Sequence, residues 1–241
     1  MIVIIVSEQR SKMSDLISSV RANNLEGVNN CLVRGDDVNT KDVDDWTALM
    51  VACCAGKSAI VSRLVVEEEL DINYQGGDGY TAALLATEDG ETECVRVLAG
   101  TGKVDWNLGD KMGWTPLYWA LHQGHCDIVD ILLEIPGLNL NVKTVYGETL
   151  AHAAARGGVR IVETLASQEK FDCWNVPDKY GDTPVVKALK WDTIDSVKVL
   201  VDCPLVDLTI RDKDGWTLAM RTIAGEMLGG EMLGGEVLGE C

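Results

Sequence analysis

The chain has 241 residues, of which 46% are apolar, and 38 acidic against 21 basic residues give it a formal net charge of −17. The apolar fraction is sufficient for a folded, soluble core. The charge disfavours non-specific binding to nucleic acid or to an anionic membrane, because both need a positive field. We therefore expect neither as a partner, and partners with basic groups fit the charge better.

The N-terminus begins with the apolar run MIVIIV, which the charged SEQRSK follows. A signal-peptide core needs ~7–15 apolar residues and a membrane span ~20, so this run is too short for either. We expect residues 1–13 to be a disordered or dispensable leader. The eight cysteines show neither metal-ligand nor disulfide spacing, which favours small buried hydrophobic residues in a reducing cytosol. A cytoplasmic or nuclear location without a metal or cofactor is expected.

A fixed repeat of 34 residues organises most of the chain. A glycine or aspartate stands two positions before each recurring threonine, and an alanine follows five positions after each of the first five. The threonines are Thr47, Thr81, Thr115, Thr149, Thr183 and Thr217. A column of asparagines recurs at the same step, at Asn39, Asn73, Asn107, Asn141 and Asn175. Agreement across so many columns indicates an architectural unit rather than a single site.

The segment GWTPLYWALHQG illustrates the unit. Gly113 permits a positive φ in a turn, Thr115 caps a helix and Pro116 suits the first helical position. Gly124 ends this helix, IVDILLE supplies a second one, and an extended LNLN follows it. Each unit is therefore predicted to be helix, turn, helix and a hairpin-like loop.

The period alone suggests tetratricopeptide repeats, but Gly-x-Thr-Pro starts and the recurring DVN, DIN and DWN do not fit them. On these motifs the chain resembles the ankyrin-repeat family over residues 14–224. The resemblance implies an all-α fold with short β-hairpin loops, an ankyrin-repeat α-solenoid. It is divided into an N-terminal capping unit at 14–44, full repeats at 45–78, 79–112, 113–146, 147–180 and 181–214, and a partial repeat at 215–224.

Two departures from the family pattern affect the expected structure. The complete Thr-Pro-Leu-His motif occurs nowhere, and only His152 keeps the histidine. Its loss elsewhere predicts less rigid helix starts. Repeat four has a one-residue deletion that a later insertion compensates. After these repeats, residues 225–241 form a low-complexity Gly/Met/Leu tail, which we expect to be poorly ordered, and the last repeat to lack a proper second helix.

The resemblance also implies a concave binding groove. The position directly after the turn glycine or aspartate carries an aromatic residue in three consecutive repeats, and such residues dominate interface hot spots. The other interpretation, left open, is that these rings pack on the neighbouring hairpin. The predicted partner-binding residues are Trp46, Tyr80, Glu88, Asp89, Met112, Trp114, His122, Gln123, Glu148, Asp182, Trp191 and Trp216. Among them the carboxylates are expected to select basic groups of the partner.

A modification is a second implication of the resemblance, because ankyrin asparagines are substrates of an asparaginyl hydroxylase. Asn73 and Asn141 have the setting most similar to such sites. The alternative is that asparagine closes the hairpin by hydrogen-bonding the local backbone.

No catalytic motif is recognisable, and CCAGKS at 53–58 lacks the first glycine of a phosphate-binding loop. We therefore expect a monomeric, non-enzymatic scaffold that binds a partner protein. The alternative is an ankyrin-repeat regulatory fragment of a larger enzyme or adaptor protein.

Overall fold

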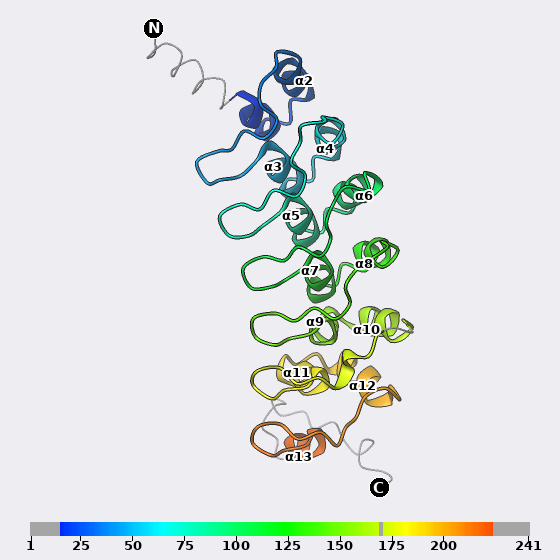
Figure 1. Cartoon of the computed structure of the whole chain (residues 1–241). Helices are drawn as coiled ribbons and strands as arrows, with labels where there is room; N and C mark the ends of the chain where they lie inside the picture. The colour runs from blue at the N-terminus through cyan, green and yellow to red at the C-terminus, as the bar shows by residue number, and fades with distance from the viewer. Residues whose placement is uncertain (1–14, 169–170, 224–241) are drawn as a thin grey trace. The chain divides into compact units, whose positions relative to one another are not determined.

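A computed structural model describes residues 15–168 and 171–223 (Figure 1). These residues form two compact units, which are described separately: unit 1 comprises residues up to Leu117 together with Asp127–Leu138, and unit 2 comprises Tyr118–Cys126 and the residues from Asn139 onward. The expectations for residues 1–13, for the tail at 225–241 and for a second helix in the last repeat lie outside the described residues.

Unit 1 consists of antiparallel helix pairs joined by long loops. It contains helical residues 15–21, α2 (Leu25–Val33), α3 (Ala48–Cys54), α4 (Ser58–Leu64), α5 (Ala82–Glu88), α6 (Thr92–Gly100), the first residues of α7 (Pro116–Gln123) and most of α8 (Cys126–Leu133). In this unit α3 packs on α5 and α4 packs on α6, so that first helices form one row and second helices another (Figure 1).

Unit 2 repeats this arrangement. It contains the rest of α7, then α9 (Leu150–Gly157), α10 (Val159–Ala166), the 3-10 helix η1 (Cys173–Asn175), α11 (Pro184–Lys190), α12 (Ile194–Asp202) and α13 (Leu218–Ile223). Here α9 packs on α11 and α10 on α12. The predicted all-α repeat solenoid is confirmed for the described residues, and the hairpin loops carry isolated antiparallel bridges at Lys41 with Thr47 and at Lys143 with Thr149.

Threonine starts the first helices as the sequence predicts. Thr47 Oγ1 accepts a hydrogen bond of 3.2 Å from the Met50 N–H, and Thr81 Oγ1 accepts one of 3.1 Å from the Leu84 N–H. His152 adds a second contact in its own repeat, because its Nδ1 accepts a hydrogen bond of 3.0 Å from the Thr149 N–H. The starts of α3 and α5, which lack the histidine, thus keep the threonine cap, whereas Thr183 at the start of α11 makes no side-chain cap bond.

The core lies between the two helix rows of each unit. The alanine column is fully buried, which lets consecutive first helices approach closely. Trp106 and Trp174, which precede the asparagine column, are only 5% and 1% exposed and belong to the core. Of the cysteines, Cys31, Cys53, Cys94 and Cys173 are buried, while Cys54, Cys126 and Cys203 are partly exposed.

The asparagine column joins each repeat to the next one. Asn73 Nδ2 donates to the Lys103 carbonyl at 3.0 Å, and its Oδ1 accepts from the Asp105 N–H at 2.8 Å. Asn39 and Asn175 each make the same pair of hydrogen bonds with the backbone of the repeat that follows them. The interpretation that asparagine closes its own hairpin was therefore wrong. The residue two positions earlier does this, as when Asp105 Oδ1 accepts from the Asn107 N–H.

Asn141 is the exception in this column. Its Oδ1 accepts only a weak contact of 3.5 Å from the Cys173 Sγ. Cys173 belongs to the segment where the compensating insertion of repeat four falls, and η1 forms there. The altered register therefore replaces the inter-repeat backbone bonds at this position.

Candidate functional site

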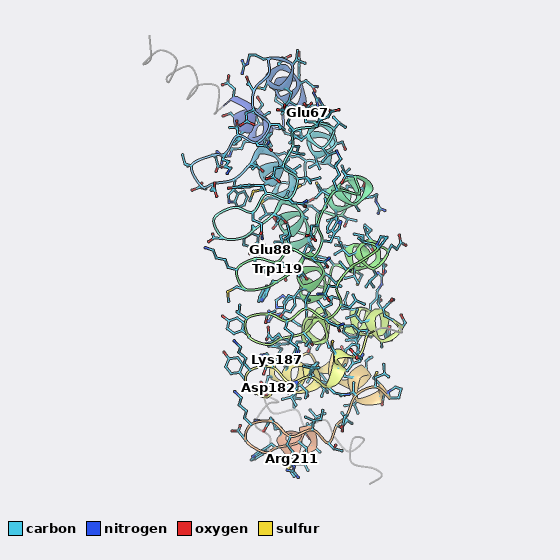
Figure 2. All side chains as sticks on the ribbon, viewed as in Figure 1. Glu67, Glu88, Trp119, Asp182, Lys187 and Arg211 are labelled. Carbon is cyan, nitrogen blue, oxygen red and sulfur yellow. The ribbon has the colours of Figure 1, made fainter. Side chains whose placement is uncertain are left out.

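A cavity of about 320 Å³ opens on the hairpin side of unit 1. The loop before α3, the following loop before α5, and the ends of both helices surround it. Its apolar wall includes Trp46, Tyr80, Met50 and Leu85, and its polar wall includes Asp44, Asp78, Glu88 and Asp89. Glu88 lies at the end of α5 beside the hairpin loops (Figure 2). The lining contains no lysine, arginine or histidine.

Two glycines of the second hairpin explain why space remains there. In other repeats the position of Gly76 carries an oxygen-bearing side chain that accepts two backbone N–H bonds, as Asp110 does from Met112 and Trp114. Gly76 has no side chain, and a Cβ on it would lie 3.2 Å from Met50 Cε. A Cβ on Gly77 would meet no atom within 4 Å. Both glycines line the cavity and add no side chain to it.

The electrostatics of the cavity disfavour further negative charge. Burial, together with the neighbouring Glu88, raises the pKa of Tyr80 to about 12. Burial and the adjacent Asp89 raise the pKa of Glu88, and burial with Asp89 raises the pKa of Cys54 to about 11. All three shifts follow from desolvation beside carboxylates. The cavity is thus a place where an incoming cation would be stabilised.

The predicted site residues of unit 1 do not all meet at the cavity. Trp46, Tyr80, Glu88 and Asp89 line it together, as the groove prediction requires. Trp114 and Met112 are partly buried on the next hairpin and do not line it. Met50, Cys54, Gly76 and Leu85 were missed. The available signal was the Gly76-Gly77 pair, which interrupts a column that is otherwise Asp42, Asp110, Thr144, Asp178 and Asp212.

Two predicted carboxylates of unit 2 are occupied within the chain. Buried Glu148 accepts a hydrogen bond of 2.7 Å from the Tyr118 hydroxyl and lies 2.9 Å from Lys187 Nζ. Buried Asp182 is bound by Lys190 Nζ at 2.6 Å. Asp182 and Lys187 both lie where the hairpin meets α11 (Figure 2). The structure therefore gives these two carboxylates internal cations, which the sequence analysis did not foresee.

Of the remaining predicted residues of unit 2, His122 contacts Trp191. The His122 ring stacks near Tyr118 at 6.0 Å and meets the Trp191 ring edge-on at 6.4 Å. Burial, helped by the positive charge of Arg156, lowers the pKa of His122 to about 4, so the ring is neutral near neutral pH. Gln123 is exposed, and Trp216 is partly buried with Arg221 over its ring at 5.9 Å.

The two asparagines predicted for hydroxylation differ in their surroundings. The amide nitrogen and the amide oxygen of Asn73 both form hydrogen bonds with the next repeat. Asn141 is exposed, and its side chain has the Cys173 contact alone among the described residues. Their modification stays a prediction.

A comparison with protein families matches residues 66–144 to the family model described as ankyrin repeats (3 copies). A search among curated proteins found no match to this chain. Within residues 15–168 and 171–223, every helix is too short or too polar to cross a membrane.

Proposed function

Because this chain carries ankyrin repeats, which are generally protein–protein interaction modules, we propose that it is a non-enzymatic scaffold that binds a partner protein through the hairpin side of unit 1. The cavity between the first two complete hairpins is the centre of this surface. Trp114 and Met112 on the following hairpin extend it. The proposal includes a monomer that works in the cytoplasm or nucleus.

The observation that carries the proposal is the composition of the cavity. Two aromatic rings, Trp46 and Tyr80, share it with four carboxylates and no basic side chain. Aromatic faces and carboxylates both attract cations, and buried aromatics dominate binding energies at protein interfaces. The volume of about 320 Å³ accommodates one long side chain. The partner is therefore proposed to insert a lysine or arginine side chain here, with apolar contacts around it.

The ion pairs within unit 2 reduce the number of predicted carboxylates that are assigned to partner binding. Glu148 already binds Lys187, and Asp182 already binds Lys190. A partner that bound these carboxylates would have to break two desolvated ion pairs, which is energetically unfavourable. Selectivity for basic groups is assigned instead to Glu88 and Asp89 at the cavity.

The proposal is tested by partner capture followed by measurement of affinity. Proteins retained from a lysate by the full chain are identified by mass spectrometry, purified, and titrated by calorimetry. The double variant Trp46→Ala, Tyr80→Ala should weaken binding by more than about tenfold, because it removes both aromatic walls. Circular dichroism should show the same helix content as the parent.

Tyr74→Ala is the matched control. Tyr74 is also a partly buried aromatic residue of unit 1, but its hydroxyl bonds Asp45 and its ring holds Lys41, away from the cavity lining. This control should leave affinity unchanged. An unchanged affinity in the double variant would reject the cavity as the binding site.

A further inference from the structure

A continuous row of cations and aromatic rings lies on unit 2. Arg156 and Lys187 each lie 5.4 Å from the centre of the Trp191 ring, and Lys187 and Lys213 each lie 5.4 Å from the centre of the Tyr180 ring. We call these five residues the cationic strip. They come from α9, from α11 and its hairpin, and from the hairpin before α13. Four cation–π contacts thus link side chains from three successive repeats.

Two of the three cations of the strip have no ion-pair partner among the described residues. Lys187 is bound by Glu148 and Asp178. Arg156 and Lys213 are exposed, and neither forms an ion pair with any residue among 15–168 and 171–223. These two exposed cations contrast with the formal net charge of −17 of the whole chain.

Most nearby carboxylates are already bound to other cations. Glu148 and Asp178 both bind Lys187, and Asp214 lies beside Lys213 in sequence but bonds Arg221 at 2.8 Å. Asp192 follows Trp191 and is exposed, with no ion pair inside the described segments.

The close packing of two hairpins holds part of the strip in place. Gly181 adopts a φ of 82°, and a Cβ there would lie 2.8 Å from the Lys213 backbone nitrogen. The hairpin that carries Tyr180 therefore lies against the hairpin that carries Lys213. The Tyr180 side chain nevertheless remains 55% exposed. A large aromatic ring held beside an exposed cation is accessible to a ligand.

We propose that the cationic strip binds an acidic segment of a partner protein, whose aspartate or glutamate carboxylates contact Arg156 and Lys213 and whose apolar side chains pack on Tyr180 and Trp191. Guanidinium groups bind carboxylates with two parallel hydrogen bonds, and the positive edges of aromatic rings add a favourable field. This surface lies in the other unit from the cavity and has the opposite charge. It therefore goes beyond the proposed function.

A short acidic segment fits better than nucleic acid. A long polyanion would extend past the strip and meet the field of a chain that is strongly negative overall. A short peptide in which a few carboxylates alternate with apolar residues contacts the strip alone. Its apolar side chains can pack on the Tyr180 and Trp191 rings, a contact that a phosphate backbone does not use.

The experiment is a fluorescence-anisotropy titration of the full chain with a labelled short peptide of alternating glutamate and leucine. The glutamate peptide should bind, and binding should weaken as salt is added. A peptide with glutamine in place of glutamate should bind more than about tenfold more weakly, because it lacks the charge. Single-stranded DNA of similar length should not compete.

The variants locate the binding. Arg156→Gln with Lys213→Gln should weaken the glutamate peptide more than about tenfold. The control Lys103→Gln with Lys198→Gln removes the same charge at two exposed positions outside the strip, and should change affinity less than about twofold. The cavity variant Trp46→Ala, Tyr80→Ala should bind this peptide like the parent.

Three results would overturn the proposal: no binding of the glutamate peptide, equal binding of the glutamine peptide, or equal losses in the strip and control variants. Because both strip substitutions are at exposed positions, circular dichroism melting should show that the variants fold like the parent.

Discussion

Lys187 Nζ lies 2.7 Å from Asp178 Oδ2 in unit 2, although the side chain of Asp178 is 0% exposed and that of Lys187 only 13%. Burial alone would favour the neutral forms. Hydrogen bonds between the two groups and with Glu148 outweigh it, so the pKa of Lys187 is raised and that of Asp178 is lowered. Both groups are therefore charged, and Arg221 pairs with Asp212 in the same relationship one repeat later.

Replacing Lys187 by methionine should destabilise unit 2 by about 3 kcal/mol, because it leaves two buried carboxylates, on Asp178 and Glu148, without their cation. Methionine keeps the length of the aliphatic side chain, so lost packing contributes little. The measurement is urea unfolding followed by tryptophan fluorescence.

Lys198→Met is the control for this prediction. Lys198 pairs with Asp195 at 3.1 Å, but both side chains are largely exposed. Its replacement should change the free energy of unfolding by less than about 0.5 kcal/mol. Equal effects of the two substitutions would show that burial of the Lys187 cluster does not contribute.

The repeat architecture could be predicted from sequence because its determinants are local. Thr47 and Thr81 cap helices within three residues, and turn glycines such as Gly113, with a φ of 77°, need only their own backbone. A contact between a side chain of one repeat and atoms of another repeat could not be predicted from such local patterns. The side-chain amide of Asn73 forms hydrogen bonds with backbone atoms about one repeat further along the chain, and rules of local secondary-structure propensity do not address contacts at that separation.

The candidate site was only partly predictable for the same reason. The aromatic column indicated Trp46 and Tyr80, but the cavity depends on the absence of a side chain at Gly76. Lys187 was not recognised as the partner of a predicted contact residue. A lysine in a first-helix column that is Val51, Leu85, Trp119 and Ala153 in the preceding repeats was the available signal.

Replacing each of two glycines by alanine should change the free energy of unfolding in opposite directions, because their surroundings differ. Gly157 lies at the end of α9, where a Cβ would overlap the Leu121 carbonyl oxygen, so Gly157→Ala should destabilise by about 2 kcal/mol. Gly100 ends α6 with no atom within 4 Å of a Cβ, so Gly100→Ala should stabilise by about 0.5 kcal/mol. Thermal melts of both variants would check the signs, and a stable Gly157→Ala protein would contradict the close approach.

The asparagine column gives a comparison between two repeats. Asn73→Ala removes two hydrogen bonds to the next repeat and should lower the free energy of unfolding by about 1.5 kcal/mol. Asn141→Ala removes only the sulfur contact and should cost less than about 0.5 kcal/mol. Urea titrations of both variants measure the difference, and equal costs would show that the inter-repeat bonds are not the source of stability.

The partly buried His122 should make stability depend on pH. Its pKa falls from an ordinary 6.5 to about 4 in the folded chain, because burial and then Arg156 disfavour the protonated ring, while Glu148 opposes them. The unfolded chain therefore binds the proton more readily, so stability is lost as pH falls from 6.5 towards 4. The lowered pKa of His152 acts in the same direction.

The test compares urea unfolding at about pH 7 and about pH 5 in the parent and in His122→Asn. The variant should lose less stability between the two pH values than the parent, because the His122 ring no longer titrates. His125→Asn, which removes a histidine just before α8, is the control for the substitution itself, and its pH dependence should change less than that of His122→Asn. A His122→Asn protein with the full parental dependence would place the titration elsewhere, at His152 or at the carboxylates.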